Sequence, residues 1–246
     1  MPISANTLFH FTRKFETLVK ILESKFLPKL CLEDSIMPSA IPIRLAVPMV
    51  CFCDIPLSQV SEHTLKYGRY AIGIKKEWAM KQGVTPVLYV HENSLIPNTI
   101  ISEMQNISIS IQGQKNPDYS KMMRLIDVVC MMKRYHGYDS RLGKEIRYYD
   151  EREWRYIPKR ESQDQFCYLL ESFYNKESVR SAVNLANEKY GVVFNPDAIN
   201  YLIVDKESEI LKLQRIVREI KGIFPHDSVE LLTTRILSLE RIEQDM

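Results

Sequence analysis

Short apolar runs alternate along this chain with segments whose apolar residues recur at helical spacing. The clearest run, Val47 to Cys53, lies between flanking proline-containing stretches. Its length suits a buried strand and is too short for a helix. Thr7 to Thr12 has the character of a second strand, and the apolar residues of segment 15–26 behind it have helical spacing. This alternation predicts an α+β fold with a mixed or antiparallel sheet core flanked by helices.

The alternation typical of strands and the spacing of three to four residues typical of helices predict the other elements. We expect further strands at residues 70–74, 86–90, 146–149, 153–157, 199–204 and 229–233. We expect helices at residues 56–67, 77–82, 118–134, 163–174, 176–190 and 208–221. Four prolines and no clean period predict an irregular, site-covering loop from Leu27 to Pro48. Since no linker divides the chain, we expect one domain over residues 1–246, motif-bearing at 1–160 and helix-rich at 161–246.

Composition excludes several classes of protein. Hydrophobic residues make up 45% and charged residues 26%, with a net charge of +2, so the chain is neither disordered nor strongly basic as a whole. Only 8 glycines are present, and no dinucleotide-binding fingerprint or P-loop occurs. No signal-peptide pattern or membrane-length apolar run occurs, and five cysteines without paired spacing favour reduced thiols. We therefore expect a cytoplasmic protein without a membrane or metal site.

Glu151 and Glu153 form a Glu-x-Glu pair in a stretch with strand character, so both side chains project to one face. Neighbouring carboxylates can have separated pKa values. One then stays ionised beside a developing cation while the other orients a nucleophile. The same pattern is also typical of a solvated, charged edge strand.

His10 and Thr12 share one face of the first predicted strand, whereas Phe9 and Phe11 share the other. An imidazole and a hydroxyl at this spacing suit the hydroxyl groups of a ribose. A hydrogen-bonded structural histidine is an equally good interpretation. We expect the His10 face and the Glu153 face to line a common cleft.

His63 and Tyr67 are four residues apart on a predicted helix that ends at Gly68, so their side chains lie on one side of it. Together with Tyr70 they offer an aromatic surface for a flat ring. The alternative is a tyrosine packed in the corner between helix and strand.

Residues 121–160 contain eleven Lys/Arg against six Asp/Glu, with six Tyr/Trp interleaved. This mixture is typical of a surface that grips phosphates and stacks on bases. Candidate substrate-binding residues are Arg134, Arg141, Lys144 and Arg155. A solvated helix and loop explains the charges equally well.

Several of these stretches occur in an order that resembles the AbiGi family of bacterial abortive-infection proteins. They are residues 8–12, 48–58, 63, 67–74, 76–79, 86–90 and 151–155, in the first two-thirds of the chain. The resemblance implies a role in phage defence within an operon of the toxin–antitoxin type, with a cognate toxin or antitoxin as partner.

A more distant similarity to ADP-ribosyltransferases implies a mechanism and a fold of that type. It places His10, with Thr12, on the ribose of NAD, Glu153 beside the oxocarbenium-like transition state, and Glu151 on the acceptor. Tyr67 or Tyr70 would take the nicotinamide pocket, because Cys51-Phe52-Cys53 replaces the expected hydroxyl residues.

Three functional hypotheses follow. The first is an NAD-dependent ADP-ribosyltransferase that modifies a macromolecule such as RNA or DNA. The second is a non-catalytic antitoxin or interaction module that binds a toxin, and the third is a nuclease or another nucleic-acid enzyme. Convergence of His10 and Glu153 in one pocket distinguishes the first from the second.

Overall fold

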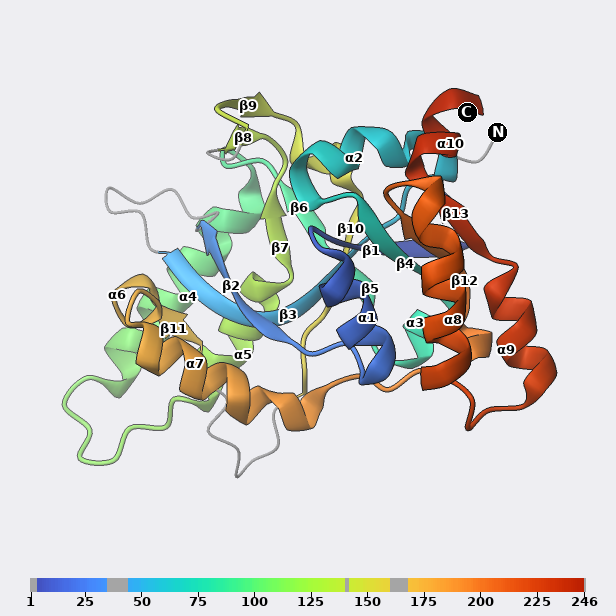
Figure 1. Ribbon diagram of the computed structural model, residues 1–246. Helices are drawn as coiled ribbons and strands as arrows, with labels where there is room; N and C mark the ends of the chain where they lie inside the picture. The colour runs from blue at the N-terminus through green and yellow to red at the C-terminus, as the bar shows by residue number, and fades with distance from the viewer. Residues whose placement is uncertain (1–3, 35–43, 140–141, 160–167, 246) are drawn as a thin grey trace.

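The computed structural model describes residues 4–34, 44–139, 142–159 and 168–245. Its centre is a mixed sheet with strand order β13-β12-β4-β1-β3-β10-β5 (Figure 1). β12 pairs with β13 in parallel, whereas β1, β3, β4 and β10 pair antiparallel with their neighbours. These strands span Thr7–Thr12 (β1), Arg44–Cys53 (β3), Tyr70–Lys75 (β4), Thr85–Pro86 (β5), Glu153–Tyr156 (β10), Ile199–Val204 (β12) and Ile236–Ser238 (β13). The predicted α+β class with a mixed sheet is confirmed.

Six further strands, ten α-helices and five 3₁₀ helices complete the described part of the chain. β2 (Lys29–Asp34) and β11 (Leu169–Leu170) pair with β3, β6 (Leu88–Val90) pairs with β7 (Met132–Arg134), and β8 (Gly137–Asp139) pairs with β9 (Lys144–Ile146). The α-helices are α1 (Phe15–Glu23), α2 (Val60–Tyr67), α3 (Lys76–Lys81), α4 (Leu95–Ile111), α5 (Ser120–Cys130), α6 (Glu171–Tyr174), α7 (Glu177–Ala186), α8 (Ile210–Ile220), α9 (His226–Thr233) and α10 (Leu239–Asp245). The 3₁₀ helices are η1 (Leu57–Gln59), η2 (Tyr148–Glu151), η3 (Asn187–Tyr190), η4 (Pro196–Ala198) and η5 (Glu207–Glu209).

One side of the sheet, which we call the apolar face, carries the main hydrophobic core. Leu8, Phe52, Ile72 and Leu202 project there, because alternate residues of paired strands share a face. α1 and α8, which lie in front of the strands in Figure 1, cover these residues. Their own buried residues recur three and four positions apart, so each helix has one apolar stripe: Phe15, Leu18 and Leu22 on α1, and Leu213 and Val217 on α8.

The opposite side, which we call the charged face, begins with a small apolar cluster and ends in ionised groups. Phe9 and Ala71 pack there with residues of α2 and α10. Cys53 pairs in register with Phe9 on one side and with Glu153 on the other. The face therefore passes from apolar side chains at β1 to carboxylates and guanidinium at β10.

Gly68 fixes the turn between α2 and β4. Its φ is 115°, and a Cβ atom built on it would lie 2.2 Å from the Thr12 carbonyl oxygen. Only glycine fits this conformation and this close approach. The predicted end of the helix at Gly68 is confirmed.

Several predicted elements are wrong. Residues 29–34 form β2 and residues 44–53 form β3, where an irregular loop was expected up to residue 48; residues 35–43 lie outside the described residues. Residues 229–233 belong to helix α9, because Val229 and Leu232 are buried at helical spacing. The helix predicted to reach residue 134 ends at Cys130, and β7 follows it. The predicted helix at 163–174 falls partly outside the described residues; within them it is only α6.

Helix α4 was not predicted at all. It is rich in Ile, Ser and Asn, residues with weak intrinsic helix propensity. In the part of the chain that the structure describes, no helix combines the length and the apolar character needed to cross a membrane.

Candidate functional site

Buried ionised side chains cluster on the charged face, where β10 meets α2, β7 and η2. Lys133 Nζ lies 2.6 Å from Glu151 and also pairs with Glu153. Arg155 Nε lies 2.5 Å from Glu153 Oε1; Glu151, Glu153 and Arg155 are buried, and the Lys133 side chain is 11% exposed. Further pairs extend the cluster at both ends. We call the ion network the set Glu33, Lys66, Lys133, Asp139, Glu151, Glu153 and Arg155.

The two ends of the ion network tie it to other elements. Lys66 of α2 pairs with Glu151 and lies 2.5 Å from Asp139 of β8. At the other end, Arg155 Nη2 donates to Glu33 of β2 at 2.6 Å and Nη1 donates to the Cys130 carbonyl at 2.8 Å. Residues from six elements are therefore held together by ion pairs, although they are up to 122 positions apart in the sequence; the Glu33 side chain is 32% exposed.

A backbone turn brings Glu151 and Glu153 together. Arg152 between them is left-handed, with φ 44° and ψ 50°, and its carbonyl accepts a hydrogen bond from Asp54 N–H at 3.0 Å. This turn separates η2 from β10 and aims both carboxylates at Lys133. The predicted convergence of the two glutamates is confirmed, but Glu151 lies in a 3₁₀ helix and not on a strand.

The ion network keeps its groups charged. Burial alone raises the pKa of Glu151, but Lys133 and Lys66 outweigh it and hold the pKa below its ordinary value. Burial also raises the pKa of Glu153, but Arg155 and Lys133 outweigh this effect and hold the pKa below its ordinary value. Both carboxylates are thus ionised and already neutralised by cations. This arrangement stabilises a fixed geometry and leaves little uncompensated negative charge for a developing cation.

Tyrosines cover the ion network. The Tyr148 ring lies 5.0 Å from Lys66 Nζ and 5.1 Å from Lys133 Nζ, which is a favourable distance for cation–π attraction. The Tyr89 hydroxyl accepts a hydrogen bond from Glu153 N–H at 2.8 Å. Burial raises the pKa of both Tyr67 and Tyr89, which keeps these hydroxyl groups protonated.

More tyrosines reach the solvent above this layer. We call the tyrosine surface the set Tyr135, Tyr138 and Tyr149, which are 37%, 59% and 44% exposed. The Tyr135 and Tyr149 rings stack at 5.5 Å, and Tyr149 meets the Tyr89 ring edge-on at 5.3 Å. Tyr89 in turn contacts Glu153 through its hydroxyl. The Tyr135 and Tyr149 rings are therefore connected through Tyr89 to the backbone of β10, next to the ion network.

His10 lies on the apolar face, away from the ion network. Its neighbour Phe9 shares the register position of Cys53 and Glu153, so His10 points to the other side of the sheet. Its Nδ1 donates to the Cys51 carbonyl at 2.8 Å, and its ring packs at 5.4 Å from Phe26. The prediction that His10 and Glu153 line a common cleft is wrong, because strand alternation separates them.

The other predicted cofactor residues are also divided between the faces. Thr12 Oγ1 donates to the Lys14 carbonyl, and Tyr70 donates to Glu209 at 3.0 Å, both on the His10 side. Tyr67 belongs to the charged face, where its ring stacks with His63 at 6.4 Å as the helical spacing predicts. Binding of NAD stays a prediction, but its four proposed residues, His10, Thr12, Tyr67 and Tyr70, do not form one site.

The predicted substrate-binding cations also separate. Arg155 is 1% exposed and fully engaged in the ion network, so the prediction that it contacts a substrate at the surface is wrong. Arg134 is half-buried on β7, and Lys144 is exposed on β9. Arg141 lies outside the described residues. Binding of RNA or DNA stays a prediction.

Sequence reasoning missed Lys66, Lys133, Asp139 and Glu33 as members of the ion network. Lysines are mostly exposed in proteins, so a lysine in a charged stretch carries no signal of burial. The one available signal was the excess of cations around Glu151 and Glu153. Within the described ranges, no group of three or more His, Cys, Asp or Glu side chains is arranged to hold a metal ion.

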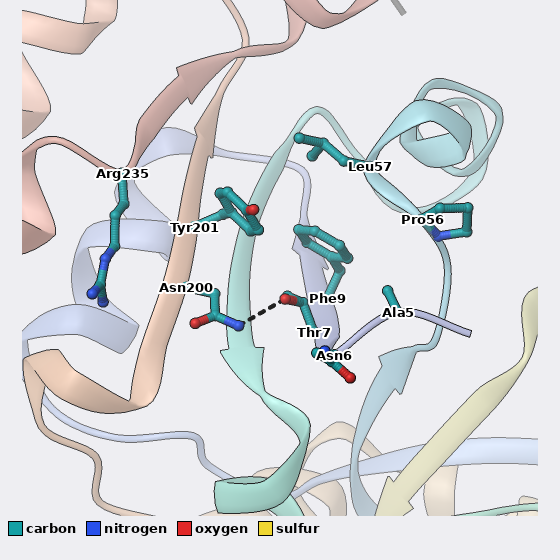
Figure 2. A pocket seen from close by; sticks show the side chains of 9 residues that line it. All are labelled: Ala5, Asn6, Thr7, Phe9, Pro56, Leu57, Asn200, Tyr201 and Arg235. Carbon is teal, nitrogen blue, oxygen red and sulfur yellow. Dashed lines mark hydrogen bonds between the residues drawn. The ribbon is translucent and has the colours of Figure 1, made fainter. Parts of the chain in front are cut away.

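A separate hollow of about 480 Å³ lies at the N-terminal end of β1 (Figure 2). The Phe9 and Tyr201 rings stack at 6.2 Å in its wall, and Asn200 Nδ2 donates to Thr7 Oγ1 at 2.8 Å. Pro56 and Leu57 close its opposite side. It shares no lining residue with the ion network.

Two comparisons with known proteins find relatives. A family model described as "Putative abortive phage resistance protein AbiGi, antitoxin" matches residues 24–205. The chain is also similar to the abortive phage resistance protein AbiGi of Lactococcus lactis subsp. cremoris, with 30% identity over 231 residues, 81% of this chain and 88% of that protein. No solved structure matches. Neither match carries the predicted similarity to ADP-ribosyltransferases.

Proposed function

We propose that this chain, which belongs to the AbiGi family of abortive phage resistance proteins, acts as an antitoxin that binds and neutralises a cognate toxin. The observation that carries the proposal is the match of residues 24–205 to a family described as an antitoxin. The interaction-module hypothesis therefore takes precedence over the transferase hypothesis.

The geometry of the ion network supports a binding role over a catalytic one. A catalytic carboxylate stabilises positive charge that develops on the reacting atoms, so its own charge must not be fully neutralised by the protein. The Glu153 carboxylate is already paired with both Lys133 and Arg155. The residue predicted to cooperate with it, His10, lies across the sheet. A buried, fully paired network is typical of a scaffold that specifies one arrangement of its surrounding elements.

The tyrosine surface is the contact region that we assign to the toxin. Tyrosine is enriched at the centre of protein interfaces, where its ring buries a large area and its hydroxyl can still hydrogen-bond. Tyr135 and Tyr149 are already stacked, so binding would order few further rotamers. The adjacent Arg147 is paired with Asp150 at 2.8 Å, which reduces the free positive charge that nucleic acid would need.

Growth rescue tests this proposal. Cells that express the toxin encoded beside this chain should arrest, and co-expression of the wild-type chain should restore growth. The double variant Tyr135→Ala/Tyr149→Ala should fail to restore growth at equal protein level. Phe173→Ala, which removes a 49% exposed ring on α6, is the matched control and should rescue like wild type. Growth arrest caused by the chain alone, or absence of rescue by wild type, would overturn the antitoxin role.

A further inference from the structure

Helix α4 is set apart by its lack of charge. Between residues 93 and 114 the single charged side chain is Glu103, although 26% of the residues of the whole chain are charged. The helix lies at the opposite end of the molecule from α9 (Figure 1). Depletion of charged residues is the compositional mark of an interface core.

The helix has two separate stripes. Its inner stripe includes Ile100 and Met104, which pack with Val90, Val129 and Met132. Its outer stripe, at spacings of four and three residues, consists of Leu95, Thr99, Ser102, Asn106 and Ile109. All five are exposed, and Leu95 and Ile109 reach 80% and 69%. Two large apolar side chains thus stand in solvent at the two ends of an uncharged stripe.

The polar groups of the outer stripe are partly satisfied within the helix. Thr99 Oγ1 donates to the Leu95 carbonyl and Ser102 Oγ donates to the Asn98 carbonyl, each at 3.0 Å. Covering these side chains would therefore leave neither hydroxyl proton without a partner. The two hydroxyl groups of the stripe can therefore be covered at low cost.

The two ends of the outer stripe are chemically alike about its centre, Ser102. Leu95 and Ile109 are each seven residues from it. When two such helices lie antiparallel, Leu95 of each faces Ile109 of the other. The small Ser102 side chain at the centre allows the helices to approach closely. A two-fold contact needs this kind of self-complementary surface.

We infer that a second copy of this chain docks on the outer stripe of α4, antiparallel about a two-fold axis through Ser102, so that the protein forms a homodimer. Because the stripe carries no charge, two copies can meet on it without the repulsion that a stripe of one sign would cause. A helix of 17 residues is about 25 Å long, so the contact lies at the small end of specific interfaces. The dimer should dissociate on dilution.

Sedimentation equilibrium of the purified full chain over a wide dilution series tests the dimer. Wild type should show a monomer–dimer equilibrium. Ser102→Glu and Ser102→Lys should each raise the dissociation constant by about a hundredfold or more, because identical charges meet on the axis. An equimolar mixture of these two variants should regain a heterodimer. Ser208→Glu, at an exposed serine of η5, is the matched control and should dimerise like wild type.

Disulfide trapping tests the register. Ser102→Cys should give a covalent dimer on mild oxidation, whereas Leu95→Cys should do so only when combined with Ile109→Cys. Ser208→Cys and the wild-type chain control for random cross-linking and for the native cysteines. A wild-type chain that stays monomeric at every concentration would overturn the inference. Unchanged dimerisation of Ser102→Glu would also overturn it. If wild type is monomeric and Ser102→Glu no longer neutralises the toxin, the inference is likewise overturned, and the stripe is then assigned to the toxin.

Discussion

Trp154 and Glu153 are neighbours on β10, yet their side chains enter two different environments. On the apolar face, Trp154 joins a core of aliphatic and aromatic residues under α1 and α8. On the charged face, Glu153 is buried between Lys133 and Arg155. The apolar core is stabilised by the burial of apolar surface area, and it tolerates many combinations of side chains. The ion network is stable only when every partner is present, so it specifies how α2, β7, η2 and β10 meet.

Removal of one charge from the ion network should have the largest effect on stability. Glu153→Gln leaves Lys133 and Arg155 buried without their shared carboxylate, and we expect a loss of about 3–5 kcal/mol in the free energy of unfolding. Urea unfolding measures it. Glu145→Gln, at an exposed carboxylate on β9, is the control and should leave the unfolding midpoint unchanged. A Glu153→Gln variant as stable as wild type would contradict the network's structural role.

A cavity on the apolar face should cost slightly less. Leu202 is fully buried in β12, and Leu202→Ala should lower the free energy of unfolding by about 2–5 kcal/mol, with relaxation of neighbours setting the value. Because no charge is involved, the loss should be the same at pH 7 and pH 5. A strongly pH-dependent loss would show that the two faces are coupled.

Acid should weaken the charged face. The pKa values of Glu151 and Glu153 lie below the ordinary value of 4.5 in the folded chain, so the unfolded chain takes up protons first as pH falls. The contribution of these two carboxylates to the free energy of unfolding should therefore be constant near neutral pH and should fall below about pH 4.5. In Glu151→Gln this fall should be shallower. A wild-type curve that is flat from pH 5 to pH 3 would contradict the proposed pairing.

Acid should also destabilise the apolar face, but the effect should begin at a higher pH and be smaller than on the charged face. Burial lowers the pKa of His10 from its ordinary 6.5, so protonation favours the unfolded chain. The free energy of unfolding should begin to fall near pH 6.5, by at most about 1.4 kcal/mol per pH unit. His10→Gln retains a donor for the Cys51 carbonyl and should remove this part of the curve. Persistence of the slope in that variant would assign it to another group.

Local sequence patterns predicted much of the sheet but not its environment. The strands at 7–12 and 199–204 and the alternation of His10 with Phe9 follow from a period of two. The surroundings of each face of β1 are not set by the strand itself. Phe26 and α1 pack over the His10 face, so this face is covered and forms no cleft. The convergence of Glu151 and Glu153 was predictable, whereas Lys66 and Lys133 enter the site through tertiary contacts. α4 was missed because packing outweighs its weak helix propensity.

Toxin affinity measured by titration calorimetry tests most directly whether the charged face is built to present a binding surface. Tyr149→Ala should stay folded, with only a small fall in the urea midpoint from the lost ring contacts with Tyr135 and Tyr89, but should bind the purified toxin about 30-fold more weakly, as expected for an interface residue worth about 2 kcal/mol. Phe173→Ala should bind like wild type. Equal affinity of Tyr149→Ala and wild type for the toxin would contradict the account.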